Sequence, residues 1–98
     1  MANKAIDKLE SCFKETIEKM DRQFTSHEFF LKLAHANQKD YVAALATSTN
    51  KNKPVKELHY KLFTRLQKMD KLIKVEQKNY ASKDIFGISS TTTLWRKK

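Results

Sequence analysis

The spacing of the apolar residues changes once along this chain, near residue 72, and that change sets the class of fold. From Ile6 to Met69 the apolar residues recur every three or four positions, which is the period of a helix with one buried face. Residues 72–77 instead alternate in the way of a half-buried strand. With one Gly and one Pro in the chain, few tight turns interrupt the helices. The sequence therefore predicts an α+β fold, mostly helical, in which the helices precede a β-hairpin.

The first apolar stripe predicts a helix over residues 3–20. Its members are Ile6, Leu9, Phe13, Ile17 and Met20. A chain of 98 residues builds only one modest core. Two uses of the stripe therefore stay open: packing on the chain's own core, or pairing with a second copy in a homodimer through this N-terminal helix.

The next helix has the clearest start signal in the chain. Thr25 and Glu28 have the spacing of a capping box, in which each side chain bonds the main-chain amide of the other residue. Phe24 and Phe29 flank the box at the spacing of a hydrophobic staple. Both signals predict a helix that begins at Ser26 and reaches about Ala36.

Two further helices are expected before residue 72. Asn37 is a good N-cap residue, so a separate helix from there to about Thr47 is predicted, although one unbroken helix over 26–47 is an alternative. The polar residues 47–53 are typical of a loop. Pro54 suits the first turn of a helix, whose apolar stripe continues to Met69 before Asp70 or Lys71 ends it.

Two β-prone segments follow, at residues 72–77 and 91–96. They can pair as an antiparallel hairpin across a long polar loop at 78–90, which contains the apolar island Ile85–Ile88. Trp95 is expected to close the hairpin over the core.

Charge is distributed unevenly between the two halves of the chain. Residues 1–50 hold seven Lys or Arg and seven Asp or Glu, and so sum to zero. Residues 51–98 hold thirteen basic and four acidic residues, and so carry the whole net charge of +9. Because residues 51–98 are strongly positive, they create an electrostatic potential that attracts polyanions. Nucleic acid or an anionic surface is therefore the expected partner.

Other function classes lack their sequence signals. No Gly-rich phosphate loop, nucleophile motif or paired carboxylate set is present, so no enzyme activity is expected. The three His residues do not have metal-ligand spacing, and no metal or cofactor is expected. A single Cys fits a reducing, intracellular setting, and Met1 to Lys4 lead into no signal-peptide core. No apolar run reaches the length of about 20 residues that spans a membrane.

The order of elements resembles the winged helix-turn-helix DNA-binding family. The segments that carry the resemblance are Phe24-Thr25-Ser26-His27-Glu28, at the start of the family's first helix, and Leu58 to Ile73, its third helix running into the first wing strand. On this basis the chain is one domain over 1–98, with a winged-helix core of three helices and a hairpin at 23–98 and an N-terminal helical extension at 1–22. Two departures stand out: Asp70-Lys71 replaces the family's usual Gly, and the loop at 47–53 is long.

The resemblance implies a DNA-binding protein, typically a transcriptional regulator, with duplex DNA as partner and no small-molecule ligand. The third helix is expected in the major groove and the basic wing on the backbone. A cytoplasmic, nucleoid-associated protein would fit this function. An alternative is a protein-interaction winged helix that docks an acidic partner. The residues expected at the DNA are Lys51, Lys53, Lys56, Tyr60, Lys61, Thr64, Lys68, Lys78, Lys83, Arg96 and Lys97.

Overall fold

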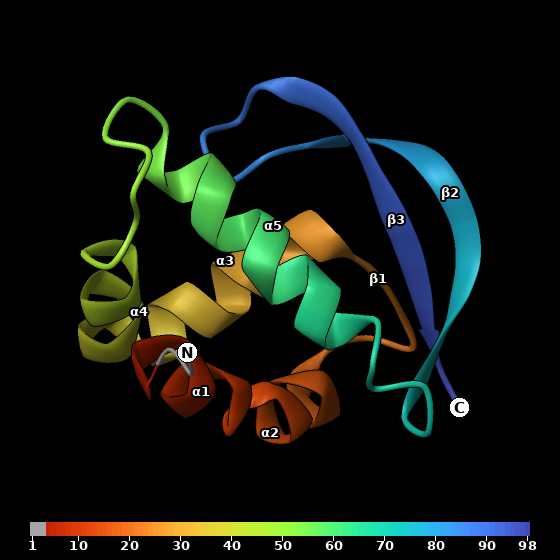
Figure 1. The fold of residues 1–98 in the computed structure, drawn as a ribbon. Coiled ribbons are helices and arrows are strands. Elements are labelled where there is room, and N and C mark those ends of the chain that lie inside the picture. Colours follow the sequence, from red (N-terminus) through yellow and green to blue (C-terminus); the bar gives the residue numbers. More distant parts are fainter. Residues whose placement is uncertain (1–3) are drawn as a thin grey trace.

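Helices pack beside a small antiparallel sheet in the computed structural model, which describes residues 4–98 (Figure 1). The sheet has the strand order β1-β3-β2, and the long β2–β3 hairpin curves around one side of the helices. The α+β class predicted from the sequence is confirmed. The elements are α1 (Lys4–Glu10), α2 (Phe13–Lys19), β1 (Gln23–Thr25), α3 (Ser26–Ala36), α4 (Gln38–Leu45), α5 (Pro54–Leu66), β2 (Ile73–Lys83) and β3 (Ser89–Lys97).

One hydrophobic core joins the helices to the sheet. Its aromatic centre is Phe29 of α3, whose ring lies edge-on to Phe13 at 5.1 Å and stacks on Phe24 at 6.0 Å between ring centroids. The apolar stripe of α5 completes the core from the other side. The buried apolar residues are Ile6, Leu9, Phe13, Ile17, Phe24, Phe29, Phe30, Leu33, Ala44, Leu58, Leu62, Leu66, Ile73 and Trp95.

The single helix predicted over residues 3–20 is wrong, because the structure breaks it into α1 and α2 at Ser11 and Cys12. The Ser11 hydroxyl donates to the Lys8 carbonyl at 2.5 Å, and the Cys12 amide bonds the Leu9 carbonyl three residues back. A serine that competes for helix carbonyls in this way destabilises the regular ladder. Asn3, where that helix was expected to begin, lies outside the described residues, as do Met1 and Ala2.

The apolar stripe of α1 and α2 packs on the chain's own core, the first of the two uses left open. Ile6, Leu9, Phe13 and Ile17 are all at most 4% exposed. The apolar residues of α1 and α2 therefore share one core with the rest of the described chain. Arg65 of α5 also pairs with Asp7 and Glu10 of α1, which ties α1 to the last turn of α5.

The predicted start of α3 at Ser26 is confirmed in detail. The Glu28 amide donates to the Thr25 hydroxyl at 3.1 Å, and the Thr25 amide donates to the Glu28 carboxylate at 2.9 Å. The separate helix after Asn37 is also confirmed, so 26–47 is not one helix. Asn37 does not cap α4 with its side chain, however, because its Nδ2 donates back to the Leu33 carbonyl at 3.1 Å.

The third helix of the sequence prediction, α5, begins at Pro54 as expected but ends at Leu66, before Asp70. Three-residue turns then carry the chain into β2, with the Lys68, Met69 and Leu72 amides bonding carbonyls three positions back. No residue between Leu66 and Ile73 has a positive φ. The Gly that the resembled family has here is therefore not needed for this connection.

The long loop predicted at 78–90 is wrong. β2 continues to Lys83 and β3 begins at Ser89, so only residues 84–88 form the turn. The pairing of β2 shifts register between Val75 and Gln77 and again between Gln77 and Tyr80, where Asn79 has a φ of 56°. Such bulges erase the alternation by which a strand is detected in sequence. Strand β1 was not predicted from the sequence. Its Phe24 pairs with Trp95 of β3.

No helix in the described part of the chain is long and apolar enough to cross a membrane.

Candidate nucleic-acid interface

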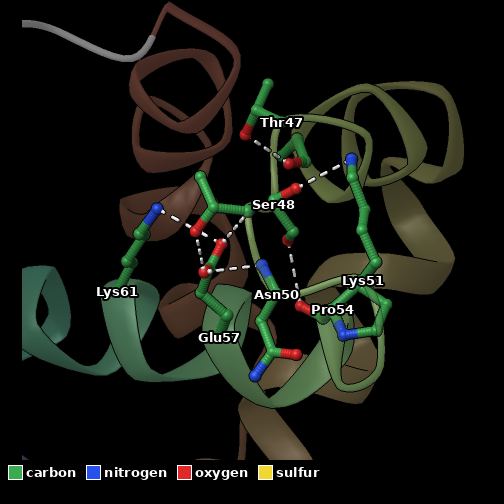
Figure 2. A network of polar contacts seen from close by, with 9 residues as sticks. Thr47, Ser48, Asn50, Lys51, Pro54, Glu57 and Lys61 are labelled. Carbon is green, nitrogen blue, oxygen red and sulfur yellow. Dashed lines mark hydrogen bonds and ion pairs between the residues drawn. The ribbon is translucent and has the colours of Figure 1, made fainter.

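The loop between α4 and α5 is tied to the first turns of α5 through Glu57. The Thr49 hydroxyl and amide donate to the two Glu57 oxygens at 2.7 and 2.9 Å, and the Asn50 amide donates at 3.2 Å. Lys61, one turn further along α5, lies 3.5 Å from the same carboxylate. Figure 2 shows Glu57 turned toward the loop with Asn50 and Lys61 around it. This network holds the α4–α5 loop against the N-terminal end of α5.

Three further hydrogen bonds lie within this loop. The Ser48 hydroxyl donates to the Pro54 carbonyl at 3.1 Å (Figure 2). The Asn50 side-chain oxygen accepts from the amides of Asn52 and Lys53, both at 3.1 Å. The Asn50 contacts are those of an Asx turn, which a side-chain amide makes with the main chain two or three residues on. The loop that is long for the resembled family is thus ordered by its own polar side chains.

The hydrogen bonds from Thr49 lower the pKa of Glu57 to about 2, against an ordinary value of 4.5. A carboxyl whose pKa is lower in the folded chain stabilises the fold at pH above its unfolded value, and that stability is lost as the pH falls from there toward 2. The loop is therefore expected to be held firmly at neutral pH and released only in strong acid.

We expect Glu57→Gln to speed amide exchange at Thr49 and Asn50 about tenfold at pH 7, because hydrogen bonds to a charged acceptor are roughly twice as strong as neutral ones. Hydrogen exchange followed by NMR measures this rate. The matched control is Glu15→Gln, whose carboxylate is exposed and, among residues 4–98, pairs only with Lys19. Equal exchange in the wild type and Glu57→Gln, or a Glu57 titration midpoint near 4.5, would contradict the expected role.

The solvent side of α5 presents several of the residues expected at DNA. Lys53, Lys56, Tyr60, Thr64 and Lys68 are exposed, and Tyr60 reaches 73%. Within α5, the spacing of Lys56, Tyr60 and Thr64 places them on the side opposite the buried Leu58, Leu62 and Leu66. Lys53 precedes the helix and Lys68 follows it. None of these lysines has an ion pair with the described residues.

Four other expected residues make internal contacts. Lys51 donates to the Ser48 carbonyl at 3.1 Å, and Lys61 pairs with Glu57. Arg96 pairs across the hairpin with Glu76 at 3.3 Å, and Lys97 donates to the Glu18 carbonyl of α2 at 3.2 Å. Arg96 and Lys97 thus lie where β3 meets β1 and the N-terminal helices, away from the hairpin turn, and we remove them from the candidate interface.

The hairpin supplies Lys78 and Lys83, both exposed. Its five-residue turn is organised by Asp84, whose carboxylate accepts from the amides of Phe86 and Ile88 at 2.9 and 3.0 Å. Gly87 has a φ of 78°, the left-handed conformation that favours glycine. Phe86 and Ile88 are consequently displayed at 66% and 62% exposure.

The hairpin and α5 are neighbours on this side of the molecule. Phe63 of α5 and Lys78 of β2 line one cavity, while Lys56 and Tyr60 of α5 line a larger one together with Phe86 of the turn. The exposed lysines of α5 and of the hairpin are therefore on adjacent surfaces, as an elongated anionic partner requires.

The larger cavity, of about 620 Å³, was not expected from the sequence. It lies between the start of α3, the first half of α5 and the hairpin turn. His59 borders it, with Nε2 2.8 Å from the Tyr41 hydroxyl and its ring 4.6 Å from that of Phe30. Burial, with a smaller contribution from nearby His27, lowers the pKa of His59 to about 4, so this imidazole is neutral at pH 7.

Among residues 4–98, no group of three or more His, Cys, Asp or Glu is placed to hold a metal ion. Comparison with known proteins gives no match to any protein-family model, curated protein or solved structure.

Proposed function

We propose that this protein binds duplex DNA through the exposed side of α5 and the β2–β3 hairpin, and that it acts as a transcriptional regulator of the winged-helix kind. In this proposal α5 enters the major groove and the hairpin lies along the adjacent backbone. The residues that we place at the DNA are Lys53, Lys56, Tyr60, Thr64, Lys68, Lys78 and Lys83. Lys51 and Lys61 are left out because the Ser48 carbonyl and the Glu57 carboxylate engage them.

One observation carries the proposal: three acidic side chains near this surface are engaged inside the protein, whereas five of its lysines make no ion pair with the described residues. Glu57 binds the α4–α5 loop, Glu76 pairs with Arg96, and Asp84 holds the hairpin turn. Lys53, Lys56, Lys68, Lys78 and Lys83 have no such partner among the described residues. A surface with unpaired cations and internally satisfied anions favours a polyanionic partner.

The geometry of α5 supports this use. Its 13 residues span about 20 Å, which is sufficient to lie in a major groove. Lys side chains at either end would contact phosphates, which position the protein without reading sequence. Tyr60 and Thr64 lie between them and would be the groups nearest the base edges, where a hydroxyl can bond to a purine or pyrimidine.

The test is fluorescence anisotropy with a random duplex of about 20 base pairs, repeated over a series of salt concentrations. We expect binding at low salt that weakens as salt rises, since each phosphate contact contributes about 0.9 to the slope of log affinity against log salt. The triple variant Lys53→Gln/Lys56→Gln/Lys68→Gln should lower that slope by up to about 2.7.

The matched control is Lys14→Gln/Lys32→Gln/Lys39→Gln, which removes the same charge from exposed positions on α2, α3 and α4. We expect its salt slope to stay within about one contact of the wild type. Equal losses in the two triple variants would mean that net charge alone attracts the duplex, which contradicts a defined interface. Absence of binding at low salt would exclude DNA and leave the docking of an acidic protein, for which exposed Phe86 and Ile88 offer an apolar anchor.

A further inference from the structure

From the cavity between α3, α5 and the hairpin turn, we infer a small-molecule site for a planar aromatic carboxylate. Its volume of about 620 Å³ falls within the range of roughly 300–1,000 Å³ typical of ligand sites. The inference concerns this cavity alone and does not depend on DNA binding.

The walls of the cavity suit a flat apolar ligand. Phe30 of α3 and His59 of α5 form an aromatic pair, and Phe63 of α5 and Phe86 of the hairpin turn also line the cavity. Because the His59 ring is neutral at pH 7, it presents an apolar aromatic face instead of a charge. A planar ring system can stack between such side chains, which favours aromatic over branched aliphatic ligands.

One of the residues that line the cavity has a polar atom without a partner. The Nδ1 atom of His27 is buried and makes no hydrogen bond in the described structure. Buried polar atoms in folded proteins are normally satisfied, so His27 retains a hydrogen-bonding capacity that no described protein group uses.

The charge at the cavity favours an anion. Lys53 and Lys56 line it and make no ion pair with the described residues. The one acidic residue of the lining, Asp84, already accepts hydrogen bonds from two amides of the turn. A carboxylate can therefore pair with Lys53 or Lys56 without displacing an internal contact, while its aromatic body lies against Phe30 and His59.

The test uses 2-naphthoate as the probe and its neutral analogue naphthalene-2-carboxamide as the control, each titrated into the full chain without DNA and followed by amide NMR. A probe of this size is expected to bind with a dissociation constant of about 1 mM. Amide shifts should be confined to the cavity, at Ser26, His27, Val55 and Phe86, and the carboxylate should bind about tenfold more tightly than the carboxamide.

Two variants separate a built site from general attraction to a basic protein. Lys53→Gln/Lys56→Gln changes exposed positions and should remove the tenfold preference for the carboxylate. Val55→Trp, on the first turn of α5, should fill the cavity and abolish binding of both probes. Shifts that are absent at several millimolar probe, that spread over lysines elsewhere, or that persist unchanged in the double lysine variant would overturn the inference.

Discussion

Replacing Phe29 by Ala is expected to lower the free energy of unfolding by about 3–5 kcal/mol. The Phe29 ring is 0% exposed and lies at the meeting point of three segments. It contacts Phe13 of α2, stacks on Phe24 of β1, and lies 6.0 Å from Phe30 on its own helix. Removing it leaves a cavity that these rings cannot close together, so both the transfer energy and the packing contacts are lost.

The matched control is Leu31→Ala, a similar truncation on the same helix at a side chain that is 40% exposed. This substitution should lower the free energy of unfolding by less than about 1 kcal/mol. Urea unfolding of the two variants measures the difference, provided that the slope against urea stays constant. If both substitutions cost the same, the aromatic cluster is not the centre of the core.

Features governed by short-range rules could be predicted from the sequence. The capping box at Thr25 and Glu28 depends on residues three positions apart, and both of its hydrogen bonds are present. The start of α5 at Pro54 and the burial of the Leu58, Leu62 and Leu66 stripe follow equally from local geometry. These elements position the exposed side of α5.

Features that depend on distant pairing could not be predicted in this way. β1 is only three residues long and exists because Phe24 pairs with Trp95, 71 positions later. The distal half of β2 is exposed and bulged, so no apolar alternation marks it, although its main chain pairs with β3 as far as Lys83. Long-range main-chain pairing stabilises such segments without leaving a side-chain pattern.

In the candidate site, too, short-range features could be predicted from the sequence and long-range contacts could not. Spacing alone placed Lys56, Tyr60 and Thr64 on the solvent side of α5, because helical periodicity determines which side a residue occupies. Nothing in the spacing could show that Arg96 would pair with Glu76 or that Lys97 would reach the Glu18 carbonyl. The cavity was missed for a similar reason, since it forms between α3, α5 and a turn that are distant in sequence.

The second large effect is expected at a buried hydrogen bond between α3 and β3. The Trp95 indole Nε1 donates to the Ser26 hydroxyl at 2.8 Å, and the two residues are 3% and 1% exposed. Ser26→Ala leaves the indole N–H buried without an acceptor, which should lower the free energy of unfolding by about 1–3 kcal/mol. Urea unfolding again measures the loss, with Ser90→Ala on the exposed part of β3 as a control that should change little.

A double-mutant cycle with Trp95→Phe isolates this hydrogen bond from packing. Phe has no N–H, so once Trp95 is replaced the Ser26 hydroxyl has lost its partner and Ser26→Ala should become nearly neutral. The coupling energy between the two positions should therefore lie between about 0.5 and 3 kcal/mol. If the effects of the two substitutions on the free energy of unfolding were additive within about 0.5 kcal/mol, the hydrogen bond would add no stability beyond that of packing. The attachment of the hairpin to the helices, on which both the proposed interface and the cavity depend, would then rest on packing such as the aromatic contact of Trp95 with Phe63 of α5.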